Sequence, residues 1–235
     1  MEIELRVKPK KGATIIEGFP GFGLVSTITT EFLIDHLEAK PIGRLKSSKV
    51  SPIIALHNGQ VVEPFGIFYH EKSNIVIVRA ISPVKDLEWD ATKALEELAD
   101  MIKAKEIIAI EGVGSDGKQP EPEAFFYTND ESRAKKFKSI GLKKLNEGVI
   151  VGISASLLIS KPDTTCIFSE AFSNVPDSRA AAKIVEVLDD YLGLDLDASP
   201  LLKKAEGFEK KIKGILQKSV EAQEAREEKQ ESYFG

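Results

Sequence analysis

Short apolar runs rich in β-branched residues alternate along the chain with longer segments in which apolar residues recur every three or four positions. The first pattern is typical of buried strands, and the second is typical of helices packed on a sheet. Strands are predicted at GATIIEG (12–18), VSPIIALH (50–57), GIFYH (66–70), NIVIVRA (74–80), EIIAIEG (106–112), GVIVGI (148–153) and TTCIFS (164–169). Helices are predicted over 24–37, 87–103, 154–160 and 178–192, with Asp177 as the N-terminal cap of the last helix and Gly193 as its stop.

The alternation of strands and helices indicates the fold class. It predicts a layered α/β core with a mixed, largely parallel sheet and helices on both faces. The run 106–112 is almost continuously apolar, as expected of a strand that is covered on both faces. Three predicted strands follow one another directly between residues 50 and 80, which favours a local antiparallel or mixed patch.

The pattern changes after Pro200. An apolar seam with a four-three-four-three spacing predicts a long helix that is docked on one side. The seam consists of Leu201, Ala205, Phe208, Ile212 and Ile215. Beyond Val220 the seam ends, and like charges recur four residues apart. We therefore expect an α/β core domain at 1–198 and a C-terminal helical arm with an exposed tail at 199–235.

Composition and charge exclude several classes of protein. Hydrophobic residues make up 42% of the chain and charged residues 29%, which is the usual balance of a soluble globular protein. The net charge is −5 with both signs mixed, so neither a nucleic acid nor an anionic membrane surface is an expected partner. No apolar run is long enough to span a membrane. The single cysteine, Cys166, excludes an internal disulfide framework and fits a cytoplasmic protein.

Two groups of residues could bind a small molecule. Gly18, Gly21 and Gly23 follow the first predicted strand and open a helix, where backbone amides could approach a phosphate. The alternative is a tight turn whose glycines permit positive φ and close packing. Polar residues also follow predicted strand ends, where ligands sit in open α/β sheets. They are Arg79, Glu111, Ser154 and Ser156, and ordinary loop polarity is the favoured explanation because no pair of them has a diagnostic spacing.

Catalysis and metal binding have little support in the sequence. The three histidines, His36, His57 and His70, lie in the first third of the chain, far from any candidate nucleophile such as Ser154. There is no G-x-S-x-G elbow and no metal-binding spacing of histidines, cysteines or carboxylates. Cys166 lies in an apolar run, which favours a buried thiol. We predict no catalytic residue, no cofactor and no metal, and therefore no enzyme.

The sequence ends in SYFG after about ten almost wholly polar residues. An aromatic pair on a polar tether is suited to a groove on another molecule, and a chain-terminal carboxylate is a ready anion for a lysine or a backbone nest. Tyr233, Phe234 and Gly235 are therefore predicted to bind a partner.

Three segments carry a family resemblance. They are GFPGFGLV (18–25), VGISASLLIS leading to TTCIFSEA (151–171), and NVPDSRAAAKIVEVLDDYLGLDLD (174–197) followed by a charged helix. In this order and spacing, over residues 10–216, they resemble the proteasome assembly chaperone family, in particular its archaeal homo-oligomeric members. The resemblance implies a core similar to the phosphorylase/hydrolase-like fold, no established catalytic activity, and assistance to proteasome α-subunit ring assembly without nucleotide hydrolysis.

The resemblance also implies a partner for the tail. Proteasome activators and some of these chaperones end in hydrophobic–tyrosine–any residue, which inserts between neighbouring α-subunits so that the terminal carboxylate meets a lysine. Those positions fall on Tyr233, Phe234 and Gly235 here. Phe234 lacks the tyrosine hydroxyl, a loss of about 1 kcal/mol, so weaker docking is expected. A homo-oligomer, for which we favour a tetramer over a pentamer, would present several tails together.

Two other functions stay open. One is a phosphorylase/hydrolase-like small-molecule enzyme, or a ligand-binding protein, that uses the glycine-rich turn and the strand-end pocket formed by Arg79, Glu111 and Ser154. The other is a scaffold whose tail only keeps the oligomer in solution.

Overall fold

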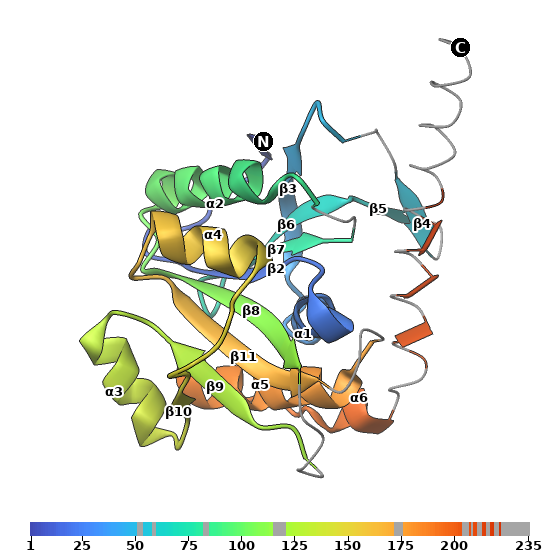
Figure 1. Ribbon diagram of the computed structural model, residues 1–235. Coiled ribbons are helices and arrows are strands. Elements are labelled where there is room, and N and C mark those ends of the chain that lie inside the picture. Colours follow the sequence, from blue (N-terminus) through green and yellow to red (C-terminus); the bar gives the residue numbers. More distant parts are fainter. Residues whose placement is uncertain are drawn as a thin grey trace, which may run out of the picture.

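The computed structural model describes residues 1–50, 54–57, 60–81, 85–114, 121–171 and 176–203, together with 207, 209–210, 213–214, 217–218 and 221. Within these residues, helices cover both faces of a nine-stranded mixed sheet (Figure 1). A separate two-stranded sheet pairs β4 (Ala55–His57) with β5 (Gln60–Val62). The predicted α/β fold class is confirmed.

The large sheet has the strand order β1-β3-β6-β7-β2-β8-β11-β9-β10. Its strands are β1 (Glu2–Leu5), β2 (Thr14–Gly18), β3 (Lys40–Lys46), β6 (Phe65–His70), β7 (Ile75–Ala80), β8 (Glu106–Gly114), β9 (Ala124–Tyr127), β10 (Lys143–Lys144) and β11 (Thr165–Ala171). The four central strands, β7, β2, β8 and β11, are parallel. On one side β1, β3, β6 and β7 pair antiparallel, and on the other β9 is antiparallel to β11 and parallel to β10. The expected antiparallel patch therefore lies where β6 meets β7.

The helices form two layers. They are α1 (Val25–His36), α2 (Glu88–Ile102), α3 (Glu131–Ser139), α4 (Gly152–Ser160), α5 (Ser178–Leu192) and α6 (Ser199–Lys203), with a short 3-10 helix, η1 (Phe22–Leu24), before α1. α2 and α4 lie side by side on one face of the sheet, and α1 and α5 pack together on the other (Figure 1). None of these described helices has the length and apolar character needed to cross a bilayer.

The central strands are apolar on both faces because both faces are covered. Ile16 and Ile108 belong to the core beneath α1 and α5, whereas their neighbours Ile15 and Ile107 belong to the core beneath α2 and α4. Successive side chains of a strand point to opposite faces, so the unbroken apolar runs of β2 and β8 supply two cores at once. The expectation that the strand in 106–112 is covered on both sides is confirmed.

The ends of α5 are fixed by the two residues that the sequence indicates. Asp177 Oδ1 accepts hydrogen bonds from the backbone N–H groups of Arg179 (3.1 Å) and Ala180 (3.0 Å). This bonding satisfies amides that have no partner inside the helix. Gly193 closes the helix in the left-handed region with φ of +69°, a conformation that costs glycine little.

The strand predicted at 148–153 is wrong. Residues 148–151 form neither strand nor helix, and Gly152 begins α4. The side chains of Val149 and Val151 are 90% and 67% exposed. β11 already pairs with β8 on one side and with β9 on the other, so this apolar run has no free strand edge beside β11 to join.

The proposed division into a core and an arm is only partly within the described residues. α6 begins at Ser199, and Leu201 is buried in the core shared by α1 and α5. Most of the predicted seam and all of the tail, residues 222–235, lie outside the described residues. The boundary after residue 198 and the long helical arm therefore stay predictions.

Candidate functional site

The connection from β2 to α1 forms one wall of the candidate site, and its glycines allow close packing. A side chain on Gly18 would place its Cβ 2.2 Å from Thr30 Cγ2, and one on Gly21 would place its Cβ 2.0 Å from Glu111 Oε1. Gly23 has φ of +64°, in the region that only glycine adopts without strain. These observations confirm the tight-turn interpretation of the three glycines.

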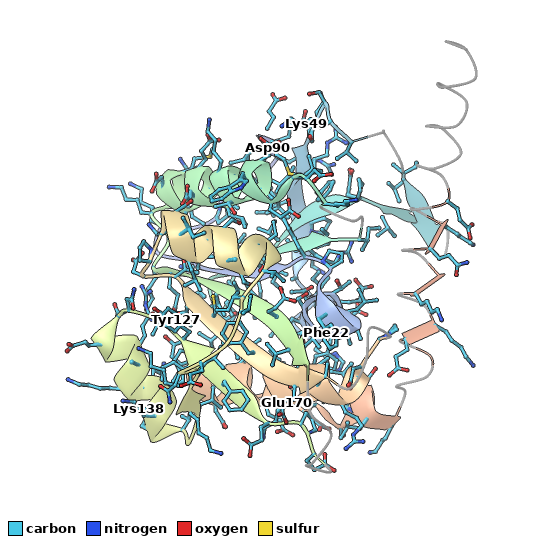
Figure 2. All side chains as sticks on the ribbon, viewed as in Figure 1. Phe22, Lys49, Asp90, Tyr127, Lys138 and Glu170 are labelled. Atoms are coloured by element: carbon cyan, nitrogen blue, oxygen red, sulfur yellow. The ribbon has the colours of Figure 1, made fainter. Side chains whose placement is uncertain are left out.

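A carboxylate of the protein occupies the position that a phosphate would take in this turn. The backbone N–H of Phe22 donates to Glu111 Oε1 across 3.2 Å. Phe22 lies at the start of η1, close to the end of β8 (Figure 2). Amides at the start of a helix are suited to anions, and here β8 supplies that anion. A phosphate placed at Phe22 would meet the Glu111 carboxylate, so the geometry does not support nucleotide binding by this turn.

Glu17 is a buried carboxyl group that the sequence analysis did not single out. It is 2% exposed, and its Oε1 accepts a hydrogen bond from the backbone N–H of Phe19 across 2.8 Å. Its Oε2 is also buried and accepts no hydrogen bond of normal geometry. The amides of Phe19 and Ile110 both lower the pKa of Glu17 and oppose the effect of burial. The signal in the sequence was a single charge inside the apolar run TIIEG.

The register of the sheet brings Glu17 and Glu111 to the same face. Glu17 of β2 is aligned with Ala109 of β8, and Ala109 is aligned with Cys166 of β11. Because side chains two residues apart on a strand share a face, Glu111 points to the same side as Ala109. Glu17, Glu111 and Cys166 therefore face the layer formed by α2 and α4.

Burial is the main reason that this group of side chains keeps its protons. Burial, followed by the charge of Glu111, raises the pKa of Glu17 to about 8. Burial raises the pKa of Glu111 to about 7, although hydrogen bonds from the amides of Phe22 and Gly112 oppose that change. Burial, followed by the two carboxyls, also raises the pKa of the Cys166 thiol. Desolvation disfavours the charged form of a carboxyl or a thiol.

A cavity of about 490 Å³ lies over the two carboxyl groups. Its walls come from the β2–α1 turn, the end of β8, residues 149–153 before and within α4, and the segment at 85–88 that leads into α2. Apolar side chains contribute much of the lining, among them Phe19, Phe22, Val113, Ile153 and Phe168. The cavity lies at the carboxyl ends of β2 and β8, where ligands sit in sheets of this type.

Of the candidate strand-end residues, Arg79 does not reach this cavity. It is aligned with Gly18, one residue beyond the pair formed by Val78 and Glu17, so it points to the opposite face of the sheet. There it donates to the Glu31 carboxylate of α1 and lies over the ring of Phe68, 4.9 Å from the ring centre.

The two candidate serines are buried on α4. The Ser154 hydroxyl is close enough to Glu111 to lower its pKa, although it makes no hydrogen bond of normal geometry. Ser156 bonds to Thr92 of α2 and joins the two helices instead of facing a ligand. The structure thus brings together Gly21, Glu111 and Ser154, and separates Arg79 and Ser156 from them.

The remaining candidates do not assemble into a catalytic or metal site. His36 stacks on Phe32 of its own helix with 3.7 Å between ring centres, and His70 bonds to Ser73. The side chain of His57 lies outside the described part of the chain. Cys166 is buried, as predicted. The described residues contain no cluster of three or more histidines, cysteines, aspartates and glutamates that could hold a metal ion. The predicted partner-binding residues, Tyr233, Phe234 and Gly235, lie outside the described residues.

Comparison with solved structures supports the fold and extends over nearly the whole chain. The structure of Pyrococcus furiosus PbaA, described as an archaeal homolog of proteasome-assembly chaperone, has a TM-score of 0.83 and 30% identity, and covers 94% of this chain and 99% of its own. P. furiosus PbaB, described as an archaeal proteasome activator, shares the fold with a TM-score of 0.75 and 22% identity, covering 91% of this chain and 98% of its own.

Sequence comparison identifies the family. An uncharacterized protein of Methanocaldococcus jannaschii is 26% identical over 219 residues, which cover 88% of this chain and 86% of that protein. Residues 15–216 match the PAC2 family. That match includes the β2–α1 turn, Glu17 and Glu111, and both helix layers. The chain belongs to the PAC2 family.

Proposed function

We propose that this protein is an ATP-independent assembly chaperone for the proteasome that binds α-subunits. The observation that carries the proposal is the similarity to PbaA, at 30% identity and a TM-score of 0.83 over 94% of the chain. PbaA is itself described as a homolog of proteasome-assembly chaperone. A likeness that extends over the core and both helix layers supports a shared role better than a likeness limited to one motif would.

The proposed role involves no catalysis and no nucleotide. The turn that would receive a phosphate is filled by Glu111, which bonds to the amide of Phe22. The arginine that an anion-binding enzyme site would use, Arg79, lies on the other face of the sheet with Glu31. Binding energy between folded chains would then supply the whole effect on assembly.

The contact with α-subunits is proposed to be made by Tyr233, Phe234 and Gly235. In this proposal the aromatic side chains enter a groove between adjacent α-subunits, and the α-carboxylate of Gly235 pairs with a lysine. Each contact would be weak, because Phe234 cannot donate the hydrogen bond of a tyrosine. A homo-oligomer, which we propose to be a tetramer, would engage several grooves at once and could gain about 10²-fold or more in avidity.

A binding experiment on purified α-subunit rings tests this proposal. Full-length protein would be compared with a variant that lacks 232–235, with a variant extended by a few residues beyond Gly235, and with Ser232→Ala as the matched control. We expect binding by the full-length and Ser232→Ala proteins and strong loss in the other two. Equal affinity of all four proteins would remove the tail from the mechanism, and no binding by any of them would refute the assignment to α-subunits.

A further inference from the structure

The cavity above β2 and β8 is lined by more acidic than basic side chains. Among the described residues that line it, three carboxyl groups face one ammonium group: Glu17, Glu111 and Glu88 against Lys85. Lys85 is an exposed side chain and Glu88 is half-buried, whereas Glu17 is buried at the base of the cavity. The deepest part of the cavity is therefore acidic and has no cation of its own among these residues.

The second observation concerns one buried oxygen of Glu17, Oε2. Glu17 is 2% exposed, and its Oε2 lacks a hydrogen bond of normal geometry while the side chain lines the cavity. A buried carboxyl oxygen without a partner is costly, and proteins rarely retain one without a ligand or a role. A donor placed in the cavity next to Glu17 would satisfy it.

The chemistry of the walls narrows the class of ligand. A divalent metal is disfavoured because the described residues offer no cluster of three or more suitable ligands. An anion is disfavoured because the amide of Phe22, a donor that could bind it, is engaged by Glu111. An ammonium group carries three N–H donors and needs acceptors of this kind, and the apolar rings of Phe19, Phe22 and Phe168 suit an aliphatic body.

We propose that this cavity binds a small organic ammonium ion, whose N–H groups donate to the carboxyl groups of Glu17 and Glu111. A volume of about 490 Å³ suits a small molecule. The site is independent of the tail and of the proposed proteasome contact, because it lies within the folded core.

Binding of a cation at this site should also release protons, which can be measured separately from the affinity. Glu17 and Glu111 hold protons near neutrality because they are buried, and the charge of Glu111 adds to the effect at Glu17. The groups that face them are the Cys166 thiol from β11, the Ser154 hydroxyl from α4, and Lys85 and Glu88 at the start of α2. A bound cation favours the ionised carboxylates, so binding releases protons and tightens as the pH rises from about 6 to about 9, while an alkylamine stays charged.

The experiment is isothermal titration calorimetry of the full chain with butylammonium chloride, in buffers of different ionisation enthalpy. Butan-1-ol and butyrate serve as the neutral and anionic isosteres. We expect saturable binding of butylammonium alone, with proton release. Loss of affinity of about tenfold or more is expected in Glu17→Gln and in Glu111→Gln, as for a lost charge-assisted bond. The matched control, Glu147→Gln, changes an exposed carboxyl outside the cavity lining and should bind like the wild type.

A measurement on the unaltered protein guards against misfolded variants. The side-chain carboxyl carbons of ¹³C-labelled glutamate should show two resonances that titrate near or above neutrality and move to lower pKa when butylammonium is added. Nα-acetyl-lysine amide distinguishes a free amine from a lysine side chain of a partner. Tighter binding of butylammonium supports a free amine, and the reverse order would overturn that part of the proposal. Equal binding of butan-1-ol, or no saturable binding of either amine, would overturn the site itself.

Discussion

Arg79 of β7 donates a hydrogen bond to Glu31 of α1 between the sheet and its helical cover, with the two side chains only 5% and 9% exposed. Arg79 also lies against the ring of Phe68. The pair fixes α1 to β7, and α1 begins directly after the glycine-rich turn. It thereby helps to position the wall of the cavity from the opposite face of the sheet.

Replacing one partner of this pair should be strongly destabilising. We expect Arg79→Met to lower the free energy of unfolding by about 3–5 kcal/mol, because it removes the arginine that pairs with the buried Glu31 carboxylate. The double variant Arg79→Met with Glu31→Leu should recover part of that loss. Urea unfolding measures both. Lys183→Met, which breaks the exposed pair of Lys183 with Glu186, serves as the control and should change stability by no more than about 0.5 kcal/mol. A near-neutral Arg79→Met would contradict the importance of the pair.

Stability should fall as the pH rises because of Glu17. Its pKa is 4.5 in the reference state and about 8 in the folded protein. Between these values the folded chain binds a proton that the unfolded chain has released, so the folded state is favoured at low pH. The contribution is fully present below pH 4.5 and is lost as the pH approaches 8, by at most about 5 kcal/mol.

Glu17→Gln should remove this pH dependence, since glutamine keeps the shape of the protonated side chain. Guanidinium unfolding at several pH values between 5 and 9 would compare it with the wild type. The wild type should lose stability relative to the variant across that range. If the free energies of unfolding of the two proteins change with pH in parallel, Glu17 has the same pKa in the folded protein as in the unfolded chain.

The thiol of Cys166 should be inert in the native protein. It is 0% exposed, and burial beside Glu17 and Glu111 raises its pKa. Because the thiolate is the reactive species, labelling by a disulfide reagent at pH 8 should be far slower in the folded state than in denaturant. Equal labelling rates in the two states would mean that the core around Cys166 opens readily.

The cap that Asp177 provides for α5 should contribute measurably to the free energy of unfolding. Asp177→Ala removes the acceptor for two backbone amides and should cost about 1 kcal/mol. Asp177→Asn keeps an oxygen in place and is the matched control, with little expected loss. Thermal or urea unfolding distinguishes the two variants, and equal losses would assign the effect to the charge of Asp177.

The tail proposal predicts a gain of affinity. Phe234→Tyr adds the hydroxyl that the hydrophobic–tyrosine–any motif carries, and should strengthen binding to α-subunit rings by up to about tenfold. Tyr233→Phe tests the other register and should change little. Surface plasmon resonance on immobilised rings would measure both. If Tyr233→Phe lowers the affinity more than Phe234→Tyr raises it, Tyr233 rather than Phe234 takes the place of the motif tyrosine.

Local sequence patterns predicted most of the central sheet and its helices, because buried strands and amphipathic helices leave strong periodic signals. The run 148–153 was misassigned because a short apolar segment at a helix start has the composition of a strand. β9 and β10 were missed because they are short and pair only at the edge of the sheet. Whether such a short segment forms a strand depends on the strands that it can pair with in the folded protein.

The candidate site was predictable in part. Glu111 and Ser154 were singled out as polar residues beside apolar strands, and the structure brings them together. Arg79 carried the same local signal, yet its register with Gly18 turns it to the other face. Glu17 was missed because its importance depends on the parallel pairing of β2 with β8, which the sequence of either strand alone does not specify.

The outermost strands of the large sheet are short and charged. β1 is four residues long with Glu2 and Glu4, and β10 is the pair Lys143–Lys144. An edge of this kind offers few unpaired backbone groups, and its charges repel an identical neighbour. Chains stored at high concentration should therefore resist aggregation in which like edge strands pair with each other.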